Sequence, residues 1–205
     1  MNKKEPAFKR KYFLWGVITL FLAFLGKVFS KAFLWLPSKG ANFDYLRPPG
    51  ASKDETLFLL KCIRCRACAN VCEAGCIRFF TFLENPAYAG TPYLIPRIKA
   101  CNLCMNCTQI CPTGALSEIP DVKEEIYERV DMGKAFVLES ACLSYNGRVC
   151  GVCRDACPLK DRAITLKPVA KPVVHEEYCI GCGRCEERCP QLPAAILVRR
   201  EKTYA

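Results

Sequence analysis

The sequence predicts a small α+β protein made of two similar cysteine-rich modules in tandem, preceded by an N-terminal apolar helix. Two observations predict this fold class. Seventeen of the 205 residues are cysteines, and all but one of them fall into four tight groups. Between the groups lie short β-branched and apolar runs bounded by proline and glycine, which are typical of strands.

The four cysteine groups share one spacing. Three groups read Cys-x2-Cys-x2-Cys-x3-Cys, and in the third group the first interval is stretched to seven residues. Bacterial ferredoxins use this spacing to hold cubane [4Fe–4S] clusters, with three cysteines on one cluster and the fourth on its neighbour. The pattern therefore predicts four [4Fe–4S] clusters, whose iron is bound by sixteen cysteines: Cys62, Cys65, Cys68, Cys72, Cys101, Cys104, Cys107, Cys111, Cys142, Cys150, Cys153, Cys157, Cys179, Cys182, Cys185 and Cys189.

Other uses of the cysteines fit this pattern poorly. Structural zinc sites use cysteine pairs separated by a longer gap, and a disulfide framework expects a secreted chain with an even cysteine count. Covalent haem needs Cys-x-x-Cys-His, and the single histidine, His175, lies outside any such motif. Cys76 is left over. It stands where Ala115 stands after the second group, so we expect a small buried residue and not a ligand.

The second module carries the complete strand pattern of a two-cluster ferredoxin. Runs at 135–138 and 194–198 predict an outer antiparallel ribbon, and runs at 163–166 and 172–175 predict an inner one. The two ribbons would cover the clusters.

The first module repeats this plan with looser spacing. Residues 57–60 precede the first cysteine group, and the runs 78–83 and 93–98 flank an insertion rich in proline, glycine and alanine. We expect the first group to pair with the second and the third with the fourth. The competing arrangement, first with fourth and second with third, stays open at this point.

A short helix is expected between the modules. Val122, Ile126 and Val130 recur every four residues and form an apolar stripe. Asp121, with Glu124 three residues later, is typical of a helix N-terminus. Little apolar core is available to either module, so metal–thiolate bonds are expected to supply much of the folding free energy.

The net charge of +10 does not indicate nucleic-acid binding. Residues 1–50 hold nine Lys or Arg and two Asp or Glu, a net +7, which leaves +3 for residues 51–205. Each cubane with four thiolates adds about −2, so four clusters make the cysteine-rich region mildly acidic. The basic excess lies in the N-terminal segment, and we expect no nucleic-acid partner.

The N-terminal segment has the features of a membrane anchor. Basic residues precede an apolar stretch, and the twenty-residue span from Trp15 to Trp35 measures about 30 Å as a helix, near the thickness of a bilayer core. The preceding charges place the N-terminus in the cytoplasm and the clusters outside. Two alternatives stay open: a cleaved export signal, because Lys9-Arg10-Lys11 resembles part of a twin-arginine motif, and an interfacial helix on a cytoplasmic protein.

Five segments are therefore expected. They are a membrane anchor or export signal at 1–38, a linker at 39–56, the first ferredoxin-like module at 57–120, a connecting helix at 121–132 and the second module at 133–200.

With these residues in view, the chain resembles the MauM/NapG type of ferredoxin-type proteins. The resemblance covers about residues 46–198. It rests on the sequence Leu-Arg-Pro-Pro-Gly-Ala at 46–51, Gly-Thr-Pro-Tyr at 90–93, the stretched third cysteine group, and Asp-Met-Gly at 131–133.

The resemblance implies an iron–sulfur electron-transfer subunit associated with quinol dehydrogenases, in which all sixteen motif cysteines are ligands. It implies a place at the bacterial cytoplasmic membrane with the clusters on the periplasmic side. The expected partners are a polytopic quinol-oxidising iron–sulfur membrane protein, a periplasmic cytochrome or reductase, and membrane lipid through the N-terminal helix.

We therefore expect a relay, not an enzyme, and no catalytic residues. Two other functions stay open. One is the iron–sulfur subunit bound permanently to a molybdenum-type or other oxidoreductase, and the other is a carrier or maturation factor for iron–sulfur clusters.

Overall fold

The computed structural model of the chain describes residues 45–200. The anchor or export signal expected at 1–38 lies outside these residues, as does the first part of the linker. Between residues 45 and 200, no helix combines the length and the apolar character needed to cross a membrane. The described part is α+β, as predicted, with short helices and two-stranded antiparallel sheets.

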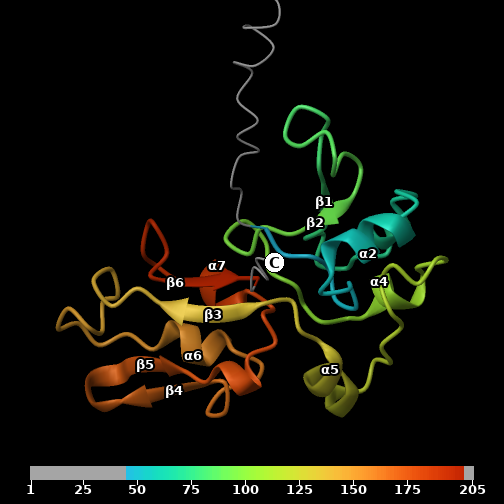
Figure 1. Cartoon of the computed structure of the whole chain (residues 1–205). Helices are drawn as coiled ribbons and strands as arrows, with labels where there is room; N and C mark the ends of the chain where they lie inside the picture. Colours follow the sequence, from blue (N-terminus) through green and yellow to red (C-terminus); the bar gives the residue numbers. More distant parts are fainter. Residues whose placement is uncertain (1–44, 201–205) are drawn as a thin grey trace, which may run out of the picture. The chain divides into compact units, whose positions relative to one another are not determined.

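Two antiparallel ribbons form the second half of the described chain (Figure 1). In the outer ribbon, β3 (Lys134–Val137) pairs with β6 (Ile196–Arg199). In the inner ribbon, β4 (Ile164–Lys167) pairs with β5 (Lys171–Val174). Both ribbons lie where the apolar runs predict them, with the strand ends shifted by one or two residues.

The first half has a smaller ribbon, and a helix precedes its first cysteine group. Strands β1 (Arg78–Phe79) and β2 (Pro92–Tyr93) flank the insertion. Residues 57–60, which were expected to follow the strand plan of the second module, lie instead in helix α2 (Glu55–Lys61). The Asp54 carboxylate explains this correction, because it accepts hydrogen bonds from the first free amides of the helix.

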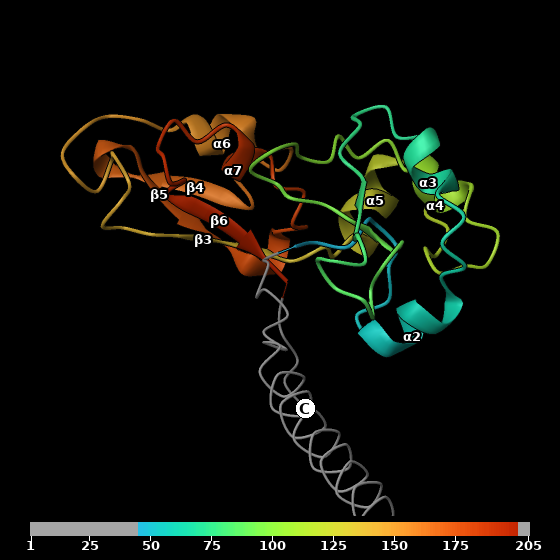
Figure 2. The same cartoon turned by 90° about the horizontal axis from the view of Figure 1, so that it is seen from above.

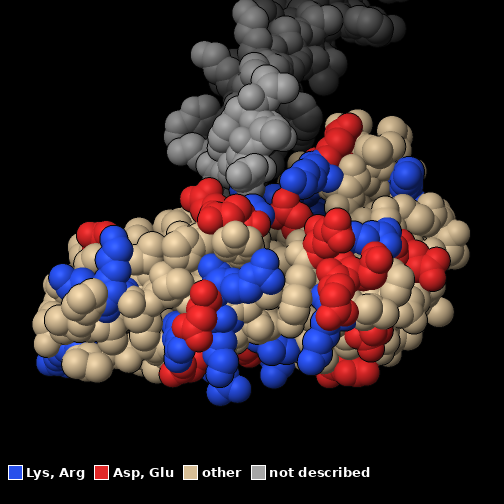
Figure 3. Space-filling model, turned by 90° about the horizontal axis from the view of Figure 1, so that it is seen from below, with Lys and Arg blue, Asp and Glu red and all other residues tan. Residues whose placement is uncertain are grey.

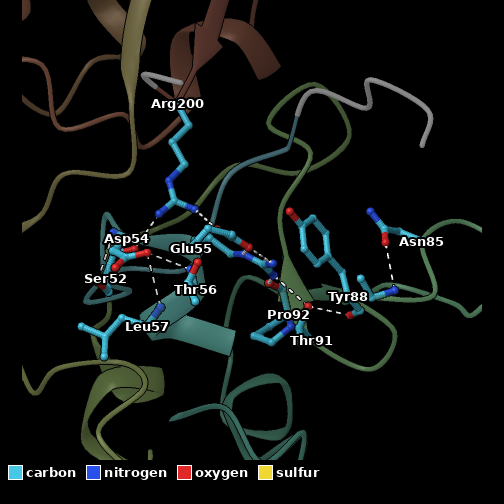
Figure 4. Close-up of polar contacts among 12 residues, drawn as sticks. Ser52, Asp54, Glu55, Thr56, Leu57, Asn85, Tyr88, Thr91, Pro92 and Arg200 are labelled. Carbon is cyan, nitrogen blue, oxygen red and sulfur yellow. Dashed lines mark hydrogen bonds and ion pairs between the residues drawn. The ribbon is translucent and has the colours of Figure 1, made fainter. Parts of the chain in front are cut away.

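The segment before α2 is fixed by a buried arginine. The Arg47 side chain is 2% exposed, pairs with Glu55, and donates to the Thr91 hydroxyl at 3.0 Å and the Pro92 carbonyl at 2.5 Å. Figure 4 shows that Arg200, which follows β6 in the second half, reaches the same Glu55 carboxylate. This network therefore joins the two halves.

Each cysteine group contains one short helical turn. The four turns are α3 (Ala67–Asn70), α4 (Asn106–Gln109), α6 (Val152–Ala156) and α7 (Arg184–Glu187). Each turn carries the third cysteine of its group, and this cysteine is buried in every case. In the second half, α6 and α7 pack against each other, α6 against β4 and α7 against β6 (Figure 2). Two 3-10 turns, at Pro168–Ala170 and Glu176–Tyr178, complete the described elements.

The connecting helix α5 spans Lys123–Arg129. Ile126 and Val130 are buried, as the stripe predicts, but Val122 is 48% exposed. Val122 is the N-cap residue, and no side chain caps the helix. The prediction of a cap pair between Asp121 and Glu124 is therefore wrong, because the helix begins after Val122 and leaves Asp121 outside the capping position.

The core is built around the cysteines. Two clusters of buried apolar side chains occur in the described residues, and both contain cysteines of the motifs. The larger cluster joins the cysteine groups to α5 and to strands β3, β4 and β6, through Ile126, Ala135, Ile164 and Val198. Aliphatic packing and cysteine placement therefore depend on the same contacts.

Candidate iron–sulfur centres

In each cysteine group, left-handed backbone conformation next to the second cysteine lets the chain turn so that its cysteines face a common centre. In the first, second and fourth groups, the residue before the second cysteine and the residue after it both have positive φ. L-residues other than glycine adopt this conformation at a cost, so it persists where surrounding contacts fix it. The residues are Arg64, Arg66, Leu103, Met105, Gly181 and Gly183, and Gly151 has the same role after the second cysteine of the third group.

This curling gathers the cysteines into sets of four. We define each set by the first three cysteines of one group together with the last cysteine of its partner group. Three of these sets each line a cavity of their own: the first set (Cys62, Cys65, Cys68 and Cys111), the third set (Cys142, Cys150, Cys153 and Cys189) and the fourth set (Cys157, Cys179, Cys182 and Cys185).

The second set consists of Cys72, Cys101, Cys104 and Cys107. Burial, followed by the charges of Cys101, Cys104, Cys68 and Cys72, raises the pKa of the Cys107 thiol. The residues that act on Cys107 are therefore the remaining members of its own set and one member of the first set. Because Cys111 shares a cavity with the first group, Cys189 one with the third and Cys157 one with the fourth, the structure pairs the first group with the second and the third with the fourth.

The sets fit [4Fe–4S] clusters by their chemistry. Each offers four sulfur donors, and the three cavities above have mostly apolar linings, which suits a cluster shielded from water. Burial raises the pKa of the Cys68 and Cys153 thiols to about 11 and that of Cys182 to about 12. Since a coordinating thiol is deprotonated, iron must displace these protons as it binds.

Cys76 lies beside the second set. Its side chain is 3% exposed, and its Sγ lies 3.6 Å from Cys72 Sγ. Hydrogen bonding to Cys101, followed by burial, raises the pKa of the Cys76 thiol. The small buried environment agrees with the expectation from Ala115, and its assignment as a non-ligand stays a prediction.

Glu73, which replaces the proline that ends the other groups, links two groups. Its carboxylate accepts hydrogen bonds from the amides of Asn102 at 3.3 Å and Asn106 at 3.2 Å. Both asparagines belong to the second cysteine group. The sequence marks Glu73 only as a departure from the motif, and its link to the second group comes from the structure.

The four sets follow one another in space. The first and second sets are neighbours, because α3, which carries Cys68, packs against α4, which carries Cys107. The third and fourth sets are neighbours, because α6 packs against α7. The Cys101 amide donates a hydrogen bond to the Cys182 carbonyl at 3.1 Å, so the second set adjoins the fourth. The order is therefore first, second, fourth, third.

Two arginines hold the middle of this series together. The Arg97 guanidinium donates to the carbonyls of Glu186 at 2.9 Å, Cys189 at 2.8 Å and Gln191 at 3.0 Å. In the reverse direction, Arg184 donates to the Asn102 carbonyl at 3.0 Å. These bonds place the second and fourth sets side by side, and nothing in the cysteine pattern identifies either arginine.

The ends of the series are open and its middle is covered. In the first set, all four residues from Ile63 to Arg66 are exposed, and in the third set residues 146–149 are exposed. The equivalent residues 102–105 of the second set are buried or half-buried, and residues 180–183 of the fourth set are all buried. The protein surface therefore comes nearest to the first and third sets.

His175 has a structural contact. Its Nε2 lies 2.9 Å from the Thr165 hydroxyl, so it bridges the strands of the inner ribbon. This contact gives His175 a structural role in the inner ribbon.

Comparisons with known proteins agree with this arrangement. The family model of the 4Fe-4S dicluster domain matches residues 61–115 and 148–192. The methylamine utilization ferredoxin-type protein MauM of Methylorubrum extorquens is 34% identical over 97% of this chain and 91% of the relative, and that of Paracoccus denitrificans is 36% identical over 83% and 78%. The ferredoxin-type protein NapG of Haemophilus influenzae is 38% identical over 75% of this chain, which spans 58% of that relative.

Proposed function

This chain belongs to the family of ferredoxin-type proteins that includes MauM and NapG, and from that membership we propose that it relays electrons from a quinol-oxidising, polytopic iron–sulfur membrane protein to a periplasmic cytochrome or reductase. It is an iron–sulfur electron-transfer protein with four [4Fe–4S] clusters. Each cluster takes up and releases one electron. The proposed location is the bacterial cytoplasmic membrane, with the N-terminal segment in lipid and the clusters on the periplasmic side.

The observation that carries this proposal is the continuous series of cysteine sets. A backbone hydrogen bond of 3.1 Å, from Cys101 N–H to the Cys182 carbonyl, joins the second set to the fourth and so connects the two modules. The first and third sets lie under exposed loops, but the second and fourth sets lie under buried or half-buried loops, which give their clusters no open path to leave. The series is therefore better suited to moving electrons than to releasing clusters.

The open ends of the series are the proposed contact points for partners. Around the first set, residues 56–72 contain Lys61, Arg64 and Arg66 and no acidic residue, and all three cations are exposed. Acidic side chains gather elsewhere, over α5 and the segment before it, as Figure 3 shows. They include Glu118, Asp121, Glu124 and Glu128. The end at the first set thus favours a partner with an acidic redox face.

We propose that the chain has no catalytic residue and acts with partners at both ends. The second function left open is that of an iron–sulfur subunit bound permanently to a molybdenum-type or other oxidoreductase. Isolation of the chain in a stable complex with a cofactor-bearing catalytic subunit would favour that second function. Transfer of its clusters to an apo-protein would favour the third function, that of an iron–sulfur carrier or maturation factor.

Quinol-dependent reduction of the cluster-loaded full chain tests the donor. Anaerobic membranes from the native cells receive a quinol, and the visible absorbance of the iron–sulfur centres is followed. We expect reduction that needs both membranes and quinol and is blocked by an inhibitor of quinol oxidation. Reduction by quinol without membranes, or none with them, would contradict the proposal.

Protease added outside intact spheroplasts tests the location. Digestion of the C-terminal segment, with the N-terminal segment retained in the membrane, is the expected result. If the C-terminal segment resists protease until the cells are lysed, the clusters lie in the cytoplasm and the proposed periplasmic location is wrong.

A further inference from the structure

The stretched interval of the third cysteine group forms an ordered loop. The Asn146 side chain donates to the carbonyls of Cys142 at 2.8 Å and Ser140 at 3.0 Å. Arg148 N–H donates to the Leu143 carbonyl at 3.0 Å. The Tyr145 hydroxyl donates to the Pro172 carbonyl at 3.2 Å and ties the loop to the inner ribbon. The extra residues therefore have one defined path.

This path buries Ser144 at the third set. Ser144 is 0% exposed, and its Oγ has no hydrogen-bond partner among residues 45–200. Ser144 lines the same cavity as Cys142, Cys150, Cys153 and Cys189. In the other three groups the two residues between the first and second cysteines include no serine or threonine, so the inserted loop supplies a hydroxyl that the shorter loops lack.

A buried hydroxyl without an acceptor destabilises a protein. The cavity lining includes aliphatic side chains such as Val137, Leu143 and Ile196, which offer no acceptor, whereas its four cysteines hold a sulfur-rich anionic group. Gln191 also lines the cavity, but neither its amide nor any other described protein group lies within hydrogen-bonding distance of the Ser144 Oγ. The sulfur of that group is thus the acceptor that the geometry leaves for the Ser144 hydroxyl.

We propose that the Ser144 hydroxyl donates a hydrogen bond to sulfur in the cluster held by the third set and thereby raises the reduction potential of that cluster. Reduction adds one negative charge, and a hydrogen bond to an anion strengthens as the anion gains charge. Hydrogen bonds to cluster sulfur are among the features that set such potentials. Because the third set is an end of the series, the hydroxyl biases electrons toward that end.

Redox titration of the cluster-loaded full chain, followed by electron paramagnetic resonance, tests this assignment. In Ser144→Ala we expect one midpoint to fall by about 59 mV, which is a tenfold loss in the equilibrium constant for a one-electron reduction. The other midpoints stay unchanged. Ser144→Thr keeps the hydroxyl and retains most of the original midpoint. Ser140→Ala removes an exposed hydroxyl two residues before Cys142 and serves as the matched control.

Unchanged midpoints in Ser144→Ala at full iron content would overturn the proposal. Equal shifts in Ser144→Ala and Ser144→Thr would also overturn it. Ser144→Thr keeps the hydroxyl, so a shift common to both variants would come from changed packing and not from the lost hydrogen bond. Ser144→Gly removes the same hydroxyl by a different change in packing and must lower the same midpoint. If Ser144→Ala fails to load iron, an unchanged midpoint in a loaded Ser144→Gly refutes the assignment by itself.

Discussion

Arg97→Met should loosen the junction between the second and fourth cysteine sets. The substitution keeps much of the aliphatic stem and removes the guanidinium, whose three shortest contacts with carbonyls of the second module measure 2.8–3.0 Å. A hydrogen bond to a charged group contributes about 1.5–3 kcal/mol. Arg97 is half-buried, so water replaces part of the loss, and we expect the free energy of opening the junction to fall by about 2–4 kcal/mol.

Hydrogen exchange at the Cys101 amide reports this opening directly. That amide donates across the junction to the Cys182 carbonyl, so it exchanges when the two modules separate. A loss of about 2–4 kcal/mol corresponds to exchange roughly 30- to 700-fold faster. Mass spectrometry of the peptide that contains Cys101, taken from the cluster-loaded full chain, provides the measurement.

Arg129→Met is the matched control. The Arg129 guanidinium also donates to a carbonyl, that of Glu118 at 2.8 Å, but this contact lies within the first half of the described chain. Its removal should leave exchange at Cys101 unchanged. Exchange within threefold of the parent in Arg97→Met would refute the reasoning, since it would mean that other contacts hold the junction.

Two other predictions concern the metal and the open end of the series. Removal of iron should leave the chain largely unfolded, because the cysteines form part of both core clusters; circular dichroism that keeps the helix and strand signal of the loaded protein would contradict this. The double change Lys61→Glu and Arg64→Glu should slow oxidation of the reduced protein by ferricyanide roughly tenfold at low ionic strength, and the effect should vanish in 1 M salt. The double change Lys160→Glu and Lys167→Glu, at exposed positions of the second half, is the control, and an equal slowing there would exclude a local effect.

The cysteine sets could be predicted because they depend on local chain geometry. With two or three residues between ligands, the chain has few conformations that bring the cysteines together. The fourth ligand of each set is then expected from the last cysteine of the neighbouring motif. The ribbons of the second module could also be predicted, because their apolar runs are short and are bounded by proline and glycine. The same signals do not reveal which non-glycine residues, such as Leu103, take left-handed backbone.

The order of the sets could not be predicted, because it depends on contacts between residues far apart in the chain. Arg97 meets carbonyls some ninety residues later, and no local pattern distinguishes it from a solvated arginine. Helix α2 was missed for a different reason. An apolar run at 57–60 suits either a strand or a helix, and the choice depends on the Asp54 side chain, which caps the helix.

Spin coupling in the fully reduced protein tests the central claim most directly. If four sites form one continuous series, electron paramagnetic resonance of the loaded chain should show four spins per chain, each broadened by at least one neighbour. Fewer than four spins would contradict the account. So would an absence of spin coupling between the two modules, because the series is continuous only through the contact between Cys101 and Cys182.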